Sequence, residues 1–254
     1  MRMTFWAAAV LMVGGLSGCV SRYTTPGAPA DFRALGITAQ EADAITDDSI
    51  AERLNRRPAA SFPANIAVVR VQDGGYRTYS MSTSDYVKYE NVTIINRRDV
   101  EDEVDMAAIR ALPRIRDISV LNRLVLPASV KEGIDLRSAA ADVHADVLFV
   151  YTFDTRFGSH TQVPFLGTIT LGLFPAEQAR VNTTVSGAFI DTRTGYVFGL
   201  VEGRVTEKQI ANLWTSSAAI DQSRRRAEKA AFKLMVGQAM DKWRHIAATF
   251  GPAA

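Results

Sequence analysis

Two long strand-forming segments, 179–191 and 196–205, constrain the fold of this chain more than any other feature. The turn sequence Asp191-Thr192-Arg193-Thr194-Gly195 separates them, and its glycine can adopt the positive φ that ends a bulged hairpin loop. Adjacent strands joined by so short a turn pair antiparallel. The sequence therefore predicts a long antiparallel hairpin.

The residues before this hairpin favour a layered domain. The near-continuous apolar run 147–153 suits a strand buried on both faces, and it follows an Ala-rich helix predicted over 135–144. A β-branched run over 65–71 predicts a central strand. Because helices alternate with buried strands, the expected class is α/β, a single layered domain with helices packed on a mixed sheet.

Further elements are expected along the chain. A helix should follow the acidic residues near position 100 and continue to Leu112. The other predicted elements are helices starting at the capping box Thr38–Glu41 and spanning 49–56, a helical turn near Ser84, strands over 91–95 and 117–125, a loop over 158–167 and an alternating strand over 168–174.

A long helix is predicted over 218–250, ended by Gly251-Pro252. Its apolar residues drift into one broad stripe, and its basic residues gather on the other side. The stripe consists of Ala227, Ala231, Leu234, Met235, Ala239, Trp243, Ile246 and Phe250, opposite Arg226, Lys229, Lys233 and Arg244.

The N-terminus has the pattern of an export signal. A basic start precedes an apolar run over 5–13, which is too short to span a bilayer. The following Leu16-Ser17-Gly18-Cys19 resembles the lipobox of bacterial lipoproteins. This resemblance implies that Cys19 is acylated and becomes the mature N-terminus, and that Val20, where Asp would signal inner-membrane retention, directs the protein to the outer membrane.

These signals divide the chain into four parts. Residues 1–18 form the signal peptide and 19–30 the lipidated N-terminus with a Pro- and Gly-containing tether. Residues 31–64 form a helical preface, and 65–250 form the α/β domain with its helix over 218–250.

Composition narrows the chemistry. Cys19 is the only cysteine, so its use for lipid leaves no thiol for a disulfide, a zinc thiolate site or a nucleophile. With 29 Lys and Arg against 27 Asp and Glu, the chain has no general electrostatic attraction to nucleic acid.

No motif identifies a catalytic, cofactor or metal residue, and none is predicted. His144, His160 and His245 lack the HExxH spacing, and the glycines form neither GxGxxG nor a phosphate-binding loop. Asp191 and Glu202 could be imagined as the carboxylate pair of a hydrolase, but loop and edge charges are the simpler interpretation.

Two charge clusters have alternative interpretations. Asp99, Glu101, Asp102, Glu103 and Asp105 could bind a cation, although carboxylates in a first helical turn also complement the helix dipole, and this second interpretation is favoured.

The run Arg224-Arg225-Arg226 opposes the dipole at the start of the last helix. A solvated face is the simpler interpretation, and contact with anionic lipid or an acidic partner is the alternative.

Two groups of residues are candidates for a partner surface. The first group consists of the apolar residues Val163, Phe165 and Leu166, which precede the alternating strand over 168–174 and could form an exposed apolar surface with it. The alternative is an edge strand that packs on the domain's own core. Lys229 and Lys233 lie on the basic side of the long helix.

The order of elements in the second half resembles the periplasmic domain shared by curli-secretion lipoproteins and the lipoprotein activators of penicillin-binding proteins. This order is a helix, Ala145-Asp146, a buried strand, an insertion, a long strand, the Asp191–Gly195 turn and a second long strand. This resemblance covers roughly 145–206. It implies a mixed sheet flanked by helices and a non-catalytic role in envelope assembly. A membrane-spanning hairpin needs two alternating strands of ~9–11 residues, whereas the insertion contains one alternating segment of seven residues. The sequence therefore does not favour pore formation.

The first hypothesis is therefore a lipid-anchored module, facing the periplasm, that binds or scaffolds an envelope protein and is not an enzyme. The alternatives are an envelope hydrolase and an oligomeric component of an export or assembly machine.

Overall fold

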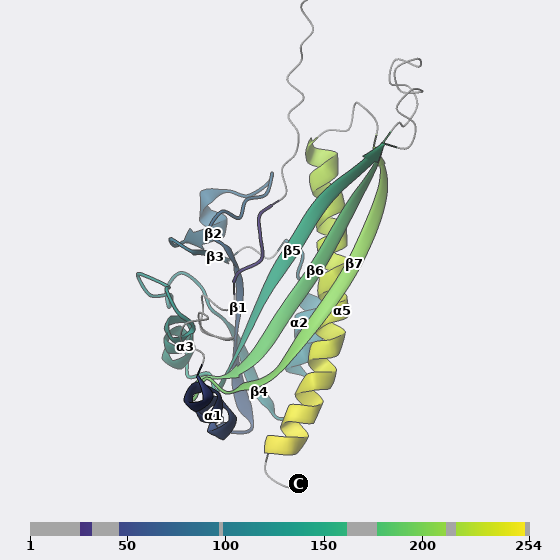
Figure 1. Cartoon of the computed structure of the whole chain (residues 1–254). Coiled ribbons are helices and arrows are strands. Elements are labelled where there is room, and N and C mark those ends of the chain that lie inside the picture. Colours follow the sequence, from purple (N-terminus) through teal and green to yellow (C-terminus); the bar gives the residue numbers. More distant parts are fainter. Residues whose placement is uncertain (1–25, 32–45, 97–98, 162–176, 212–216, 252–254) are drawn as a thin grey trace, which may run out of the picture.

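The computed structural model of the chain describes residues 26–31, 46–96, 99–161, 177–211 and 217–251 (Figure 1). Its strands form a seven-stranded mixed sheet with helices packed on it, so the predicted α/β class is confirmed. In chain order the elements are α1 Asp47–Asn55, β1 Ala64–Asp73, the 3-10 turn η2 Thr83–Asp85, β2 Tyr86–Lys88, β3 Val92–Ile95, α2 Glu103–Arg110, β4 Ile115–Val120, α3 Gly133–Asp142, β5 Val147–Thr161, β6 Glu177–Asp191, β7 Val197–Ala211 and α5 Ser217–Phe250.

The strands β1 and β5 lie at the centre of the sheet. The strand order is β2-β3-β1-β5-β6-β7, and β4 also pairs with β1. β1 runs parallel to β5, with Ile66 opposite Val147 and Val69 opposite Val150. Their paired segments, 66–69 and 147–150, are apolar and buried on both faces, as parallel central strands usually are. The predicted strands over 65–71 and 147–153 are therefore confirmed.

The strands β5, β6 and β7 form an antiparallel meander, and each has 15 residues. Between β6 and β7, Gly195 has a φ of 70°, and the Asp191 carboxylate accepts the backbone N–H groups of Arg193 and Thr194 at 2.8 and 2.9 Å. The predicted hairpin and its turn are confirmed, and the second strand extends six residues beyond Val205 to Ala211.

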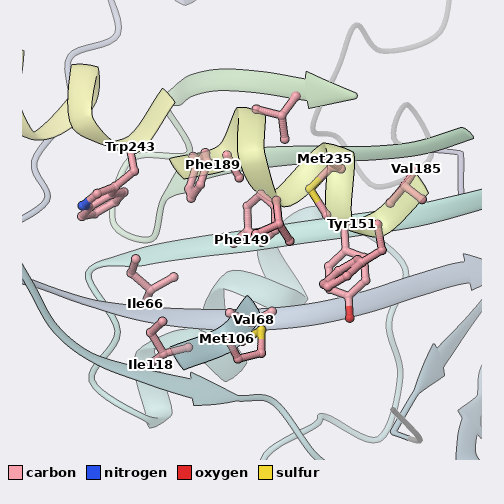
Figure 2. Close-up of a cluster of buried hydrophobic side chains, with 14 of the residues drawn as sticks. Ile66, Val68, Met106, Ile118, Phe149, Tyr151, Val185, Phe189, Met235 and Trp243 are labelled. Carbon is pink, nitrogen blue, oxygen red and sulfur yellow. The ribbon is translucent and has the colours of Figure 1, made fainter. Parts of the chain in front are cut away.

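Helix α5, 34 residues long, crosses one face of this meander (Figure 1). The buried side chains of Met235 and Trp243 join Phe149 and Phe189 in the larger apolar core (Figure 2). At Gly203 the helix backbone lies so close that a Cβ atom would stand 2.6 Å from the backbone nitrogen of Met235. A glycine is therefore required there for the helix to reach the sheet.

The opposite face of the central strands is covered by α3. Leu136 and Ala140 of this helix share a second apolar core with Leu148, Val150 and Ile190. The sheet thus lies between α3 on one side and α2 with α5 on the other. Among the described helices, none is long and apolar enough to cross a bilayer.

The predicted apolar stripe of the last helix includes two exposed residues, Leu234 and Phe250. Leu234 is 53% exposed, whereas Phe232 and Val236 are buried. A helical turn of 3.6 residues turns position 234 away from the sheet while it brings 232 and 236 toward it. Phe250 is 36% exposed, and its ring lies 5.3 Å from that of Phe198.

Two predicted strand boundaries are also wrong. Residues 158–161, expected to begin a loop, continue β5 because they pair with 177–180 of β6. The strand predicted over 117–125 begins earlier, at Ile115, and ends at Val120, after which the chain forms a turn. The rest of the predicted loop, the strand over 168–174 and the helix at Thr38–Glu41 lie outside the described residues.

Candidate functional site

The segment 26–30 occupies the fork where β1 and β5 separate. The β1–β5 register ends at Val69 opposite Val150, and beyond it Pro29 pairs antiparallel with Gln72. The segment thus supplies a short strand at the place where the two central strands diverge.

Backbone hydrogen bonds fix this segment along β1. The N–H of Arg77 donates to the carbonyl of Pro26 at 2.6 Å, and the N–H of Asp73 donates to that of Ala28 at 3.4 Å. Between these bonds, Gly27 has a φ of 123°, and a Cβ there would stand 3.0 Å from the Cα of Tyr76. A glycine is needed at this position both for its backbone angle and for the close approach.

Side chains bind the other end of the segment to β5. The N–H of Ala30 donates to Oγ1 of Thr152 at 2.8 Å, and this hydroxyl donates to Oε1 of Gln72 at 3.0 Å. The buried amide of Gln72 also exchanges hydrogen bonds with the backbone N–H and carbonyl of Phe153, at 2.7 and 2.9 Å. The side chain therefore replaces the strand pairing that the fork interrupts.

This docking corrects the predicted tether over 19–30. Its last five residues, 26–30, belong to the folded domain, because they are hydrogen-bonded to β1, to β5 and to the segment after β1. The sequence suggested a tether because a Pro- and Gly-containing segment without an apolar period carries no signal for strand pairing.

The predicted preface over 31–64 contains one described helix, α1, and its last part is tied to the hairpin turn. The buried carboxylate of Asp191 accepts the backbone N–H groups of Ala59 and Ala60 at 2.5 and 2.6 Å, in addition to its two bonds within the turn. A carboxylate that accepts four backbone N–H groups has a structural role.

The hydrolase pair imagined from Asp191 and Glu202 is not assembled. Glu202 lies opposite Ser186, five residues along β6 from Asp191. At about 3.4 Å per residue the two positions are roughly 17 Å apart, whereas glycosidase carboxylates lie roughly 5 to 10 Å apart.

A cluster of buried charged side chains joins α5 to the sheet. Two arginines, Arg70 of β1 and Arg224 of α5, are at most 3% exposed. The four carboxylates that surround them belong to Asp99, Glu101, Asp221 and Glu228.

Arg224 uses its whole guanidinium group in this cluster. Its Nε donates to Asp221 at 2.9 Å, its Nη2 donates to Asp99 at 3.1 Å, and its Nη1 donates to Glu228. Burial by itself lowers the pKa of Arg224, but the surrounding negative charges raise it above its usual value. The predicted solvated face is therefore wrong for Arg224, whereas Arg226 is exposed.

Arg70 is held less closely. Its Nη2 donates to the Tyr76 hydroxyl at 2.8 Å, and its Nη1 donates to Glu101 at 3.4 Å. The guanidinium carbon stands 4.2 Å from the ring centre of Phe153, a cation–π geometry. Glu101 also accepts the Tyr151 hydroxyl at 2.9 Å.

Glu228 is the most enclosed carboxylate of the cluster. Burial raises its pKa above the usual value, against the opposing effects of Arg224 and Arg70. Its Oε1 accepts the hydroxyl of Thr155 at 2.9 Å. The charges thus fix one position of α5 on the sheet, because separating any partner would leave a buried charge uncompensated.

A small pocket of about 10 Å³ lies beside this cluster, lined in part by Arg70, Asn96, Met106 and Tyr151. Arg70 Nε and Asn96 Oδ1, one donor and one acceptor, are buried there without a hydrogen-bond partner. The volume and the two polar atoms match one water molecule.

The acidic residues near position 100 divide between two roles. Glu103 and Asp105 lie in the first turn of α2, as the helix-dipole interpretation predicts. Asp99 and Glu101 instead pair with the buried arginines, and Asp102 pairs with Lys229 at 2.9 Å. Within the described ranges no group of three or more His, Cys, Asp or Glu side chains could hold a metal ion.

The sequence contained one usable signal for the charge cluster. Arg70 stands inside the apolar run 65–71, and a charged residue within a buried strand needs a buried partner. His144 and His245 are exposed, and the side chain of His160 lies outside what the structure describes.

The predicted partner surface is described only in part. Lys229 and Lys233 are exposed on α5, one turn apart. Val163, Phe165 and Leu166 lie outside the described residues, in the insertion that follows Thr161 of β5 and precedes Glu177 of β6.

Comparison with known proteins identifies a distant structural likeness. No family model and no curated protein matches the chain. Among solved structures, it is similar to the crystal structure of a Xanthomonas campestris protein of the family DUF330, with 11% identity and a TM-score of 0.37 over 76% of this chain and 91% of that chain. A likeness this distant supports no conclusion about function.

Proposed function

We propose that this chain is a lipid-anchored protein of the bacterial cell envelope whose domain is a non-catalytic module that binds or scaffolds an envelope partner. Its expected location is the periplasmic side of the outer membrane. The proposal combines the lipobox at Cys19 with the docking of 26–30 in the β1–β5 fork.

The docking observation carries the proposal. Cys19 lies seven residues before Pro26, whose carbonyl accepts the backbone N–H of Arg77 in the docked segment. Seven extended residues reach at most about 25 Å. A lipid on Cys19 would therefore keep the domain close to the membrane, where it meets envelope partners, and the fixed segment would define which side of the domain the membrane approaches.

Lipid attachment is tested with Cys19→Ser. This variant should accumulate as uncleaved precursor and should not be labelled by a fatty-acid analogue, because the acylated side chain is missing. Ser21→Ala, two residues away, is the matched control and should be processed and labelled normally. A processed and labelled Cys19→Ser protein would contradict the proposal.

The choice of membrane is tested at the next residue. Val20→Asp introduces the residue that the lipoprotein resemblance associates with inner-membrane retention. The variant should move from the outer-membrane to the inner-membrane fraction on density separation. If the wild-type protein is already in the inner-membrane fraction, the proposed location is wrong.

Partner binding is tested by crosslinking in cells followed by mass spectrometry. Lys229→Glu with Lys233→Glu should weaken the captured complex if the basic side of α5 binds the partner, and Phe165→Ala with Leu166→Ala should do so if the insertion binds it. Lys88→Glu with Lys131→Glu changes the charge equally at exposed positions elsewhere and should have no effect. The absence of any captured envelope protein in wild type would contradict the binding role.

A further inference from the structure

None of the described helices covers one face of the outer half of the meander. Odd-numbered residues such as Phe153, Val185 and Val201 are buried under α5, and alternation points the even-numbered residues to the other face. On the meander, α3 covers that other face near Leu148, Val150, Ala188 and Ile190. We call its uncovered part the distal face, and it consists of Asp154, Arg156, Arg180, Asn182, Thr184, Ser186, Glu202, Arg204 and Thr206.

Three arginines stand on the distal face. Arg156 lies opposite Asn182, Arg204 lies opposite Thr184, and Arg180 lies two residues from Asn182 on β6. With strands about 4.8 Å apart and a rise of about 3.4 Å per residue, the three Cα atoms lie within about 14 Å of one another.

The guanidinium groups remain available for a ligand. The side chains of Arg156 and Arg204 are 74% and 72% exposed, and Arg180 is exposed as well. Asp154 accepts Nε of Arg156 at 3.0 Å, and Glu202 lies 3.5 Å from Nη2 of Arg204. Each guanidinium has five N–H donors, so these contacts leave several donors of each group facing solvent.

The N-terminal segment emerges on the same side of the sheet. Thr152, which accepts the N–H of Ala30, is an even-numbered residue of β5, and Ala30 belongs to the apolar core on the α3 side. The segment runs antiparallel to β1, which is itself parallel to β5. From Ala30 back to Pro26 the chain therefore runs toward the outer end of the meander, the end that carries Arg156.

We propose that the distal face contacts anionic lipid headgroups of the membrane that holds the anchor, through Arg156, Arg180 and Arg204. The inference rests on the proposed lipid anchor at Cys19, which lies seven residues before Pro26 at the outer end of the docked segment. Guanidinium groups bind phosphate through paired N–H donors. The polar residues between the arginines suit a surface that lies on headgroups.

A protein comprising residues 20–254 tests this contact without the anchor. It retains every residue that the structure describes and lacks Cys19, so acyl chains cannot contribute to binding. Partition is measured by co-sedimentation with vesicles of phosphatidylcholine alone and with vesicles that also contain phosphatidylglycerol. Wild type should bind the anionic vesicles and should lose this binding in high salt.

Substitution of the arginines tests the residues. A basic side chain near an anionic surface contributes about five-fold in partition, so Arg180→Gln should weaken binding about five-fold, and the triple variant R156Q/R180Q/R204Q on the order of 100-fold. The triple variant R57Q/R110Q/R244Q removes the same charge from exposed positions elsewhere and should retain most of the binding. Thermal unfolding shows whether each variant is folded. If the triple variant is unstable, the binding of Arg180→Gln alone decides the test.

Three results would overturn the inference. Wild type could bind neutral and anionic vesicles equally, the two triple variants could lose binding equally, or the arginine variant could bind vesicles normally while losing a protein crosslink in cells. The last result would assign the distal face to a protein partner. The vesicle results do not depend on Cys19, whereas failure of fatty-acid labelling refutes the proposed anchor independently.

Discussion

Arg224 and Glu228 lie one turn apart on α5, both fully buried, and form an ion pair with each other between the helix and the sheet. The pair is joined by Asp221 on the same helix and by Asp99 from the segment before α2. The first part of α5 is therefore fixed by charge, whereas its later part, around Trp243, is fixed by apolar packing.

Replacement of Arg224 should be strongly destabilising. Arg224→Met keeps much of the side-chain volume but removes the closest cation from three buried carboxylates, which should reduce the free energy of unfolding by about 3–5 kcal/mol. Asp99 and Glu228 would keep only their longer contacts with Arg70, and Asp221 would keep its contact with Arg225. Arg226→Met, at the exposed end of the same basic run, should change it by less than about 0.5 kcal/mol. Urea denaturation of both variants measures the difference, and equal effects would mean that Arg224 is not buried.

The burial of Glu228 should produce a pH dependence of stability. Its pKa is raised above the usual 4.5 in the folded state, so the folded protein holds this proton more tightly than the unfolded chain does. Its contribution to stability should therefore decrease as pH rises above about 4.5 and should be constant at lower pH. Glu228→Gln cannot titrate and should lack this dependence.

The measurement is the difference in unfolding free energy between wild type and Glu228→Gln over a pH series. In this difference the contributions of the other carboxyl groups to the pH dependence cancel. If the arginines instead outweighed burial and lowered the pKa, the difference would move in favour of wild type as pH rises toward 4.5 and would level off above it.

Truncation to Ala should destabilise the protein strongly at Trp243 and hardly at all at Leu234. Trp243 is 1% exposed and donates its indole N–H to the carbonyl of Pro113 at 2.9 Å, so Trp243→Ala should cost about 3–5 kcal/mol. Leu234→Ala removes an exposed side chain of the same helix and should cost less than about 0.5 kcal/mol. Chemical denaturation compares the two. A large loss at Leu234 would indicate that it packs in the core, as the sequence pattern suggested.

Gly27 should be essential for docking of the N-terminal segment. Gly27→Val places a β-branched side chain at a φ of 123° and against the backbone of Tyr76. The strain, on the order of 1–3 kcal/mol, should release the segment from the fork. Hydrogen exchange should then accelerate at the amides of Ala30 and Asp73, which are hydrogen-bonded in the docked state.

The control for this prediction is Gly237→Ala in α5, where a Cβ would meet no atom within 4 Å. It should leave the exchange of the docked amides unchanged and stabilise the helix by about 0.5–1 kcal/mol. Unchanged exchange in Gly27→Val would show that the docking tolerates the substitution and that the segment is held by other contacts.

The elements that the sequence predicted well depend on local chemistry. The hairpin follows from a glycine that can adopt a positive φ between two strand-forming runs, and α5 follows from a helical period ended by Gly251-Pro252. The buried strands β1 and β5 follow from their continuous apolar runs. Each of these signals lies within one segment, so the sequence by itself determined the α/β class and most of the elements.

The contacts that dock residues 26–30 and those that form the buried charge cluster depend on tertiary structure. The amide of Ala30 meets Thr152 across 122 residues, and Arg224 meets Asp99 across 125. The pattern around either member of these pairs does not specify the other, and so Arg224 was predicted to be solvated and 26–30 to be a free tether. A hydrogen bond or an ion pair between distant segments forms only after the sheet has brought them together, because the apolar packing that places them is shared by the whole domain.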